Sequence, residues 1–287
     1  AHLLSVGAAI RFSDYSTVGQ TTTWKVDGSY APIRDITFRG TYSKAVRAPN
    51  ISELFDPTSG TFQFINPDPC AISNRSSGSP TRAANCVTQL TALGLTAAQI
   101  AAFEPSGQAA VSKLGLVGGN PDLAEEEATT WTAGAVIRPS FIPGLVISGD
   151  WYDIRIENAI SYPTATQLFA LCVDQPTLQN IFCDNITREQ GTGFATSFNV
   201  IPQNVAEFTT SGFDFQVNYR FSPSPEIGTF NVKLVGGYLE DLTFISTPGA
   251  VPDQDREEAN SPKWIGLADV TWSKDNWAIN YGLAYQR

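Results

Sequence analysis

Several residue types that carry common protein chemistry are almost missing from this chain of 287 residues. It has one histidine, His2, and no methionine. A single histidine leaves little material for a Ser/His/Asp triad, a His-ligated metal or a haem. We therefore expect no enzymatic activity, no metal site and no cofactor. The lack of methionine leaves no initiator residue, which favours a piece excised from a longer precursor.

Positive charge is also scarce. The chain has 18 Lys and Arg against 28 Asp and Glu, for a formal net charge of −10. Such a surface repels phosphate, so nucleic acid is excluded as a partner. No run approaches the roughly 18 apolar residues of a spanning helix. The start of the chain, residues 1–10, has neither a cationic leader nor a cleavage signal. A helical membrane protein is excluded, but a strand-built one is not.

The four cysteines lack the C-x-x-C spacing of zinc and thioredoxin-type sites. They form two local pairs, Cys70 with Cys86 and Cys172 with Cys183. An even count in local pairs favours disulfides, and lasting disulfides imply an oxidising compartment. Each would close a short ring and brace the loop that contains it, either to shape a ligand site or only to resist proteolysis.

Apolar and polar residues alternate with period two through most of the chain, as in two-faced strands. The clearest case is residues 212–221, where Phe213, Phe215 and Val217 interleave with polar residues. We predict nine strands with these approximate spans: 3–12, 24–30, 36–44, 130–138, 145–155, 206–221, 229–240, 263–272 and 276–286.

The predicted connections alternate between short and long. The short ones are rich in Pro, Gly, Asp and Asn, which turns require. The long ones are a link of about ten residues after the first strand and three loops at about 45–129, 157–205 and 241–262. Short turns at one rim and long loops at the other are typical of a bacterial outer-membrane barrel. The fold class we predict is all-β: an antiparallel, up-and-down transmembrane β-barrel, present here as an incomplete arc of about nine strands with long extracellular loops.

The two faces of the predicted strands differ in charge. The aromatic-rich face has 41 positions and none is charged. A charge facing lipid near the bilayer midplane costs about 2–4 kcal/mol, which explains the exclusion. Aromatic residues also gather at both ends of the strands, as in the belts at the two headgroup layers. The opposite face carries ten charges: Arg11, Lys25, Asp27, Arg39, Arg138, Asp150, Asp214, Arg220, Lys233 and Asp269.

Residues 36–57 contain Arg47-Ala48-Pro49-Asn50 and Glu53-Leu54-Phe55, the first of four stretches that resemble the TonB-dependent outer-membrane receptors. This first stretch is similar to that family's signature after a barrel strand. The run 119–123 (GNPDL), followed by Glu126, Trp131 and Gly134, resembles the place where the loop re-enters the barrel; a Pro that usually precedes Glu126 is replaced by Glu125. Further similar segments are 151–154 with the paired cysteines that follow, and 204–214.

The resemblance implies a 22-stranded barrel with an N-terminal plug domain and a periplasmic segment that contacts TonB. We therefore expect residues 1–287 to be part of one barrel domain, with the plug and the closing strands absent. The implied location is the bacterial outer membrane, in contact with its lipid. The implied function is uptake of a scarce nutrient, driven through TonB by the proton-motive force.

Residues that border the interior are expected to meet the plug and hydrate the pathway. They are Arg39, Asp150, Asp214, Gln216, Asn218, Arg220, Lys233 and Asp269. Aromatic loop residues Phe55, Phe62 and Phe64 are candidates for ligand contact. A ferric siderophore is the favoured cargo, with cobalamin and oligosaccharide as alternatives. A passive porin-like channel and a secreted β-rich carbohydrate-binding or adhesin module remain alternative functions.

Two other loop features have structural interpretations. Residues 96–103 predict a short helix with a capping box from Thr96 and Gln99. The acidic group at 125–127 and the pair Asp150 and Asp153 lack the hydrophobic pocket that a glycosidase pair needs, and the acidic run at 253–258 lacks the EF-hand spacing. We expect them to be solvated, or in the case of Asp150 to line the interior.

Overall fold

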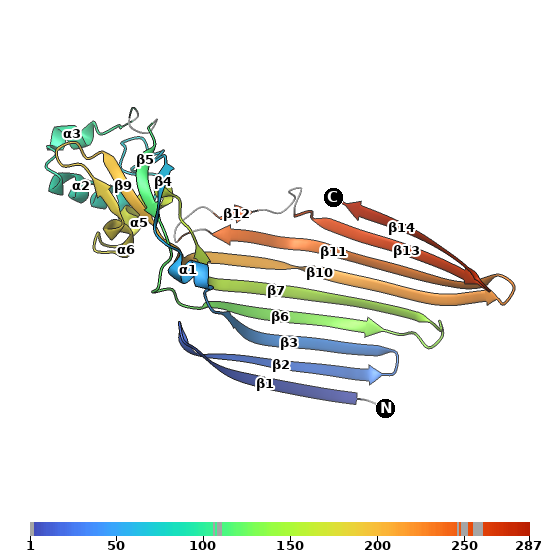
Figure 1. The fold of residues 1–287 in the computed structure, drawn as a ribbon. Helices are drawn as coiled ribbons and strands as arrows, with labels where there is room; N and C mark the ends of the chain where they lie inside the picture. The colour runs from blue at the N-terminus through green and yellow to red at the C-terminus, as the bar shows by residue number, and fades with distance from the viewer. Residues whose placement is uncertain (1–2, 106, 108–110, 246, 248–251, 255–260) are drawn as a thin grey trace.

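A computed structural model describes residues 3–105, 107, 111–245, 247, 252–254 and 261–287. One long antiparallel sheet dominates it, and a small mixed unit sits at one end of the strands (Figure 1). The main strands follow the chain as β1 (Leu3–Tyr15), β2 (Gly19–Ile33), β3 (Ile36–Arg47), β6 (Glu126–Ile137), β7 (Leu145–Ser161), β10 (Gln203–Ser224), β11 (Gly228–Ile245), β13 (Trp264–Lys274) and β14 (Trp277–Gln286).

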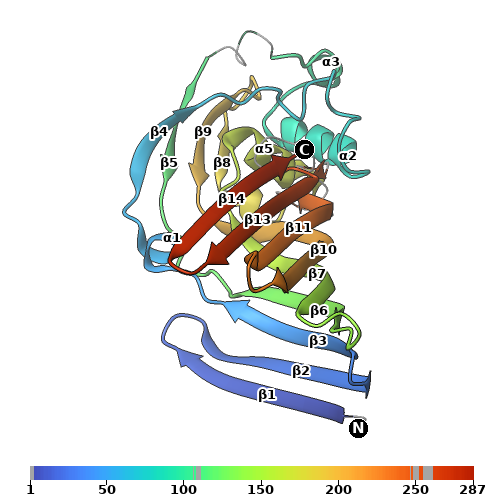
Figure 2. The same cartoon turned by 90° about the vertical axis from the view of Figure 1, so that its right-hand side faces the viewer.

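These nine strands lie side by side in chain order, with the two-residue β12 (Asp253–Gln254) added to β11. The sheet curves into an arc whose edges are β1 and β14 (Figure 2). The prediction of an up-and-down, antiparallel arc of nine strands is confirmed. No helix in the described ranges is both long and apolar enough to span a bilayer.

Most strands extend further than the alternation predicted. The prediction of a ten-residue link after the first strand is wrong: β1 and β2 pair from Leu3 with Ala31 to Tyr15 with Gly19, around a tight turn. Residues 20–23 read Gln-Thr-Thr-Thr, which is polar on both faces. Beyond the bilayer a strand needs no apolar face, so alternation ends although backbone pairing continues.

The long connections are shorter than predicted for the same reason. They span 48–125, 162–202 and 246–263, against the predicted 45–129, 157–205 and 241–262. The first two are folded rather than irregular. They contain β4 (Ser59–Gln63), β5 (Lys113–Val117), β8 (Ile186–Arg188) and β9 (Ala195–Val200), with helices α1 (Ile51–Phe55), α2 (Arg82–Ala92), α3 (Ala97–Ala101), α5 (Ala165–Asp174) and α6 (Ile181–Asp184).

The buried apolar residues of the described chain are concentrated in this small unit. We call residues 50–123 and 162–202, where described, the cap. Its core is formed mainly by Ile65, Leu90, Ile100, Phe103, Leu168, Phe169, Val173, Phe198 and the cysteines at 70, 86 and 172. On the arc, by contrast, large side chains such as Phe12, Trp131 and Tyr281 are exposed. An apolar surface of this size requires a nonaqueous environment or further protein to cover it.

Candidate functional site: the cap, its junction and the concave face

The cap is joined to the arc where the first signature motif lies. Arg47 ends β3 and is the direct cross-strand partner of Glu126, the first residue of β6. Its Nε is 2.5 Å from Glu126 Oε2 and its Nη2 is 2.6 Å from Oε1. The same guanidinium donates to both carboxylate oxygens of Glu53, each at 3.1 Å. One arginine thus ties two strand ends to helix α1.

Helix α1 is held in place by its N-terminal capping box and by the GNPDL motif at residues 119–123. The Asn50 side chain accepts from the Glu53 amide, and the Glu53 side chain accepts from the Asn50 amide, at 2.8 Å each. The Asn120 amide donates to the Glu53 carbonyl at 2.8 Å. A Cβ at Gly119 would lie 2.6 Å from the backbone of Leu54. The glycine of the GNPDL run is therefore needed for this close approach.

The last of the four similar segments, 204–214, completes the junction. Asn204, at the start of β10, accepts from the Ala124 amide and donates to the carbonyls of Ala124 and Asn158, all at 2.9 Å. The Asn120 side chain donates to the Pro202 carbonyl at 2.9 Å. Three motifs far apart in sequence thus form one hydrogen-bonded junction between the strand ends and the cap.

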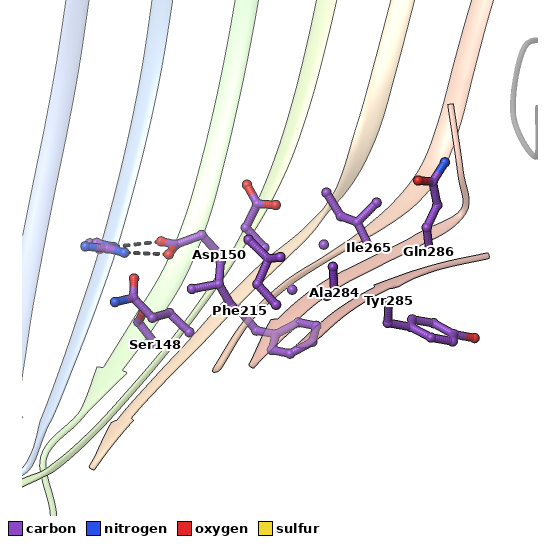
Figure 3. A pocket seen from close by; sticks show the side chains of 15 residues that line it. Ser148, Asp150, Phe215, Ile265, Ala284, Tyr285 and Gln286 are labelled. Atoms are coloured by element: carbon purple, nitrogen blue, oxygen red, sulfur yellow. Dashed lines mark hydrogen bonds and ion pairs between the residues drawn. The ribbon is translucent and has the colours of Figure 1, made fainter. Parts of the chain in front are cut away.

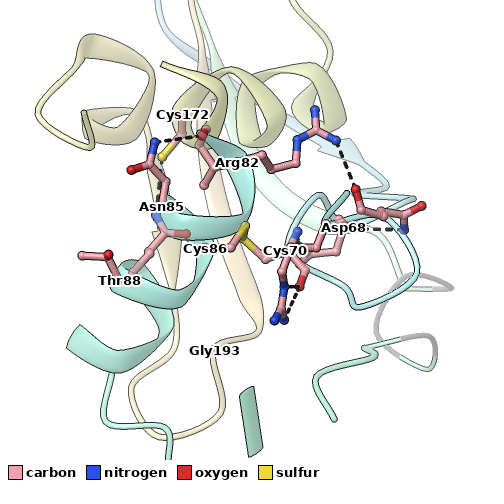
Figure 4. Close-up of a disulfide and its surroundings, with 12 residues drawn as sticks. Asp68, Cys70, Arg82, Asn85, Cys86, Thr88, Cys172 and Gly193 are labelled. Atoms are coloured by element: carbon pink, nitrogen blue, oxygen red, sulfur yellow. Dashed lines mark hydrogen bonds between the residues drawn. A yellow bond between two sulfur atoms is a disulfide. The ribbon is translucent and has the colours of Figure 1, made fainter. Parts of the chain in front are cut away.

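Both predicted disulfides are present, one in each of the two loops that build the cap. Figure 4 shows the one between Cys70 and Cys86. The loops also interlock. Arg82 Nε lies 2.7 Å from Asp174 Oδ1, and the Asn85 side chain donates to the carbonyls of Val173 and Gln175 at 3.0 and 2.7 Å. Burial alone would raise the pKa of Asp174, but bonds from Arg82 and from the Ser79 amide lower it below its usual value. The two loops therefore form one body.

A buried ion pair crosses the centre of the cap. Arg188 on β8 makes a bidentate contact with Asp68 at 2.8 and 2.9 Å, and both side chains are at most 5% exposed. Its guanidinium also lies 4.9 Å from the centre of the Phe169 ring. Removing one member would leave an uncompensated buried charge, so this pair fixes the arrangement of the cap core.

The three phenylalanines predicted to contact ligand are exposed on the cap. Phe62 is on β4, Phe64 follows it, and Phe55 ends α1, with exposed fractions of 70, 56 and 58%. Phe62 pairs across the ribbon with Leu114 of β5. The opposite face of that ribbon is packed, since a Cβ at Gly115 would lie 2.1 Å from the Phe198 ring. Seen along the strands, the ribbon lies on the side to which the arc opens (Figure 2).

A row of directly paired residues runs across the concave face of the arc. Arg39, Gly134, Asp150, Asp214 and Gly237 occupy neighbouring positions on β3, β6, β7, β10 and β11. Arg39 reaches over Gly134 to Asp150, with Nε to Oδ1 at 2.7 Å and Nη2 to Oδ2 at 2.5 Å (Figure 3). Residues in one such row share a face.

The same face forms a hollow of about 790 Å³. Its lining includes four of the predicted interior residues, Arg39, Asp150, Asp214 and Gln216, together with apolar side chains such as Ile265 and Leu267. The other four predicted interior residues do not line this hollow.

Those four lie on the same face, nearer the short turns. Asn218, Lys233 and Asp269 form a cross-strand row four residues along β10 from the row that contains Asp214. Arg220 lies two residues after Asn218 on the same strand. Asp269 accepts from the Asn280 side chain at 2.8 Å.

The convex face shows the aromatic ends expected for two headgroup layers. Near the long loops, Tyr42 stacks on Trp131 with ring centres 3.9 Å apart. Near the short turns, Phe221 stacks on Phe230 at 5.3 Å. On the described part of this face, charges lie at the level of the belts or beyond them: Asp153 is the cross-strand partner of Trp131, and farther out Lys44 pairs with Glu127 at 2.7 Å and Arg155 pairs with Glu207.

Other acidic clusters do not form a site. Among the described residues, no group of three or more His, Cys, Asp or Glu side chains is placed to hold a metal ion. Of the acidic run at 253–258, Asp255, Glu257 and Glu258 lie outside the described residues.

Sequence reasoning missed two parts of the site. The cap core was not predicted, although Thr164 and Gln167 form a capping box like that of Thr96 and Gln99, which caps the predicted helix α3. The ionic role of Arg47 was also missed. The sequence did offer one indication of this role: the signature motif contains both Arg47 and Glu53, oppositely charged and six residues apart.

Comparison with known proteins shows which family and which solved structures this chain resembles. The family model "TonB dependent receptor-like, beta-barrel" matches residues 2–287. The fold is similar to the siderophore receptor PirA from Acinetobacter baumannii, with 14% identity and a TM-score of 0.59 over 98% of this chain and 31% of that one. It is also similar to the ferric enterobactin receptor PfeA of Pseudomonas aeruginosa, solved as a mutant, with 11% identity and a TM-score of 0.59 over 99% of this chain and 30% of that one.

Among curated proteins, no sequence matches. The chain spans about a third of the length of the solved receptors that it resembles. The family match covers all but the first residue, and the arc, the signature junction and the uncharged band of the convex face between its two aromatic belts agree with it. The chain therefore belongs to the TonB-dependent receptor β-barrel family and is located in the bacterial outer membrane.

Proposed function

We propose that this chain is part of the barrel of a receptor that takes up a ferric siderophore across the outer membrane, coupled through TonB to the proton-motive force. The observation that carries the proposal is the concave polar face topped by a braced cap. The uncharged band between the aromatic belts of the convex face suits lipid, and the opposite face suits a hydrated interior. Two of the solved receptors with this fold are named for siderophores.

The domain assignment belongs to the same proposal. Residues 1–287 form one arc of a single barrel domain, and the plug and the closing strands are supplied by other parts of the full protein. Backbone groups at the edges of β1 and β14 require partners, because hydrocarbon offers none. The concave row from Arg39 to Asp214 borders the plug, and Phe55, Phe62 and Phe64 face the ligand.

A passive porin-like channel is the main alternative, since it shares the arc and the two faces. The cap favours a receptor, because a pore that sorts solutes by size does not need a disulfide-braced unit with its own core. The secreted adhesin or carbohydrate-binding module is set aside by the family and the location.

The test is uptake of radioactive iron, supplied as ferric siderophores of different chemical types, by cells that carry the full gene. A receptor gives uptake that requires TonB and stops when a protonophore collapses the proton-motive force. Uptake that persists without either would support the porin instead. A strain lacking the gene is the control for other receptors.

A further inference from the structure

The charges of the cap are distributed unevenly between its interior and its surface. By sequence the cap has eight carboxylates and four cationic side chains. Three carboxylates are engaged by arginines: Asp68 by Arg188, Asp174 by Arg82, and Glu53 by Arg47 of the neighbouring strand. The remaining five are exposed: Asp56, Glu104, Asp122, Asp184 and Glu189.

Every cation of the cap already has a partner within the protein. Arg188 and Arg82 hold the carboxylates just named. Arg75 donates to the carbonyls of Cys70 and Ile100 at 2.9 and 3.0 Å, and Lys113 also interacts within the chain. Recruiting one of these groups for a bound anion would break a contact that holds the cap together. With eight carboxylates against four cations, the cap presents a net negative charge to a molecule that approaches it.

The exposed ribbon of the cap adds an apolar surface beside this charge. Phe62, Phe64, Leu114 and Leu116 are 45–70% exposed, and we call them the apolar ridge. Asp56 adjoins one end of this ribbon: it lies three residues before β4, and its backbone carbonyl accepts from the amide of Gly119, two residues after β5, at 3.0 Å. Asp56 therefore places one negative charge at the end of the apolar ridge, and the net negative charge of the cap adds to it at longer range.

Iron chelates differ strongly in net charge. Three hydroxamates balance the charge of Fe³⁺, and a pendant ammonium group makes such a chelate a cation. Three catecholates leave a trianion. Complementary potentials speed encounter and favour the matching partner, whereas like charges disfavour the wrong one.

We propose that the cap selects an uncharged or cationic ferric hydroxamate chelate, which packs against the apolar ridge, and that it disfavours trianionic ferric tris-catecholates. This inference rests on the proposed function and narrows it to a substrate class. The proposed ligand preference differs from that of the ferric enterobactin receptor that shares the fold of this chain.

The test measures binding of two probes to the intact receptor, purified in detergent from the full gene. They are ferrioxamine B, a cationic ferric tris-hydroxamate, and ferric enterobactin, a tris-catecholate. At low ionic strength, ferrioxamine B should bind at least about tenfold more tightly. Salt should weaken binding of ferrioxamine B and should not weaken that of ferric enterobactin, because screening removes attraction in one case and repulsion in the other.

Two sets of variants separate the ridge from the charge. Phe62→Ser should weaken binding of ferrioxamine B about fivefold or more, since it removes exposed apolar contact area, whereas Phe141→Ser in the opposite rim's turn should not. Asp56→Lys combined with Asp122→Lys should reverse the order of the two probes or bring them close to equal. Asp14→Lys, on β1 and outside the cap, is the matched control.

The outcomes are distinct. Tighter binding of ferric enterobactin, or loss of its binding on addition of salt, overturns the charge inference while leaving a siderophore receptor in place. Failure of both chelates to bind, with no TonB-dependent iron uptake, overturns the proposed function and the inference with it.

Discussion

Arg39 and Asp150 lie on strands that are not neighbours, yet their side chains meet in a bidentate contact above Gly134 of the strand between them. The contact exists because position 134 has no side chain. A Cβ there would lie 2.1 Å from Asp150 Oδ1. One glycine of the family-like motif thus permits an ion pair on the concave face.

Replacing Gly134 with alanine should therefore displace Asp150 and break its contact with Arg39. We expect a loss of about 1–3 kcal/mol in barrel stability, from overpacking and the lost ion pair. Urea unfolding of the intact receptor, followed by its heat-modifiable migration on gels, measures this. Gly149→Ala is the matched control, because nothing lies within 4 Å of its added Cβ. Equal effects of the two substitutions would contradict the account of Gly134.

The Arg47 junction should control the cap more than the barrel. Arg47→Ala leaves Glu53 and Glu126, each 14% exposed, without their shared cation. We expect a cost of about 1–2 kcal/mol, discounted because Arg47 itself is 45% exposed. Protease added to whole cells should cut the cap faster while the barrel keeps its heat-modifiable migration.

The matched control for Arg47 is Lys44→Ala. It removes a single ion pair, Lys44 with Glu127, on the convex face, whose carboxylate is 36% exposed against 14% for each partner of Arg47. It should cost between zero and about 1 kcal/mol and leave the cap's protease resistance unchanged. If both variants behave alike, the junction has no special role in holding the cap.

The disulfides should stabilise the cap rather than the barrel. They join residues 16 and 11 positions apart, and closing such rings contributes about 3 kcal/mol. Replacing Cys70 and Cys86 with serine should expose the cap to protease at a lower temperature. The same pair of substitutions at Cys172 and Cys183 should act on the same unit, because the two loops share one core. Unchanged resistance in both variants would mean that the core alone holds the cap.

The ion pair between Arg82 and Asp174 should make the cap sensitive to acid. Because the folded pKa of Asp174 is depressed, its stabilising contribution is complete above the unfolded pKa of about 3.9. That contribution falls as the pH drops through the lower folded pKa. The protection factors of the α2 and α5 amides, which correct hydrogen exchange for its intrinsic slowing in acid, should therefore fall below about pH 4.

Asp174→Asn should remove this pH dependence and give faster exchange already at neutral pH. Asp184→Asn serves as the control, because Asp184 is exposed and forms no ion pair among the described residues. A retained acid response in Asp174→Asn would assign the response to another group.

The strands could be predicted where they face lipid. From residue 213 to 221 every second side chain must be uncharged, and that constraint writes the period-two pattern into the sequence. Outside the bilayer the constraint disappears, so the polar run at 20–23 gave no sign that β2 begins at Gly19. The face of each interior residue could be predicted from parity, but the contact of Arg39 with Asp150 required the cross-strand register.

The cap could not be predicted as one unit, because its core joins distant segments. Phe169 and Leu90 come from different loops, and nothing local in either loop signals the other. Local signals did predict its parts: the cysteine pairs and the capping box at Thr96. The exposure of Phe62 likewise depends on Gly115 packing against Phe198, a relation between two loops.

The central claim is that the convex face contacts lipid and the concave face contacts water. Leu234 and Val235 are adjacent on β11 and point to opposite faces. We expect Leu234→Arg to cost about 2–4 kcal/mol and to reduce membrane assembly, and Val235→Arg to leave assembly intact. The measurement is the fraction of folded, heat-modifiable receptor recovered from outer membranes. The reverse order, with Val235→Arg blocking assembly and Leu234→Arg tolerated, would contradict the account.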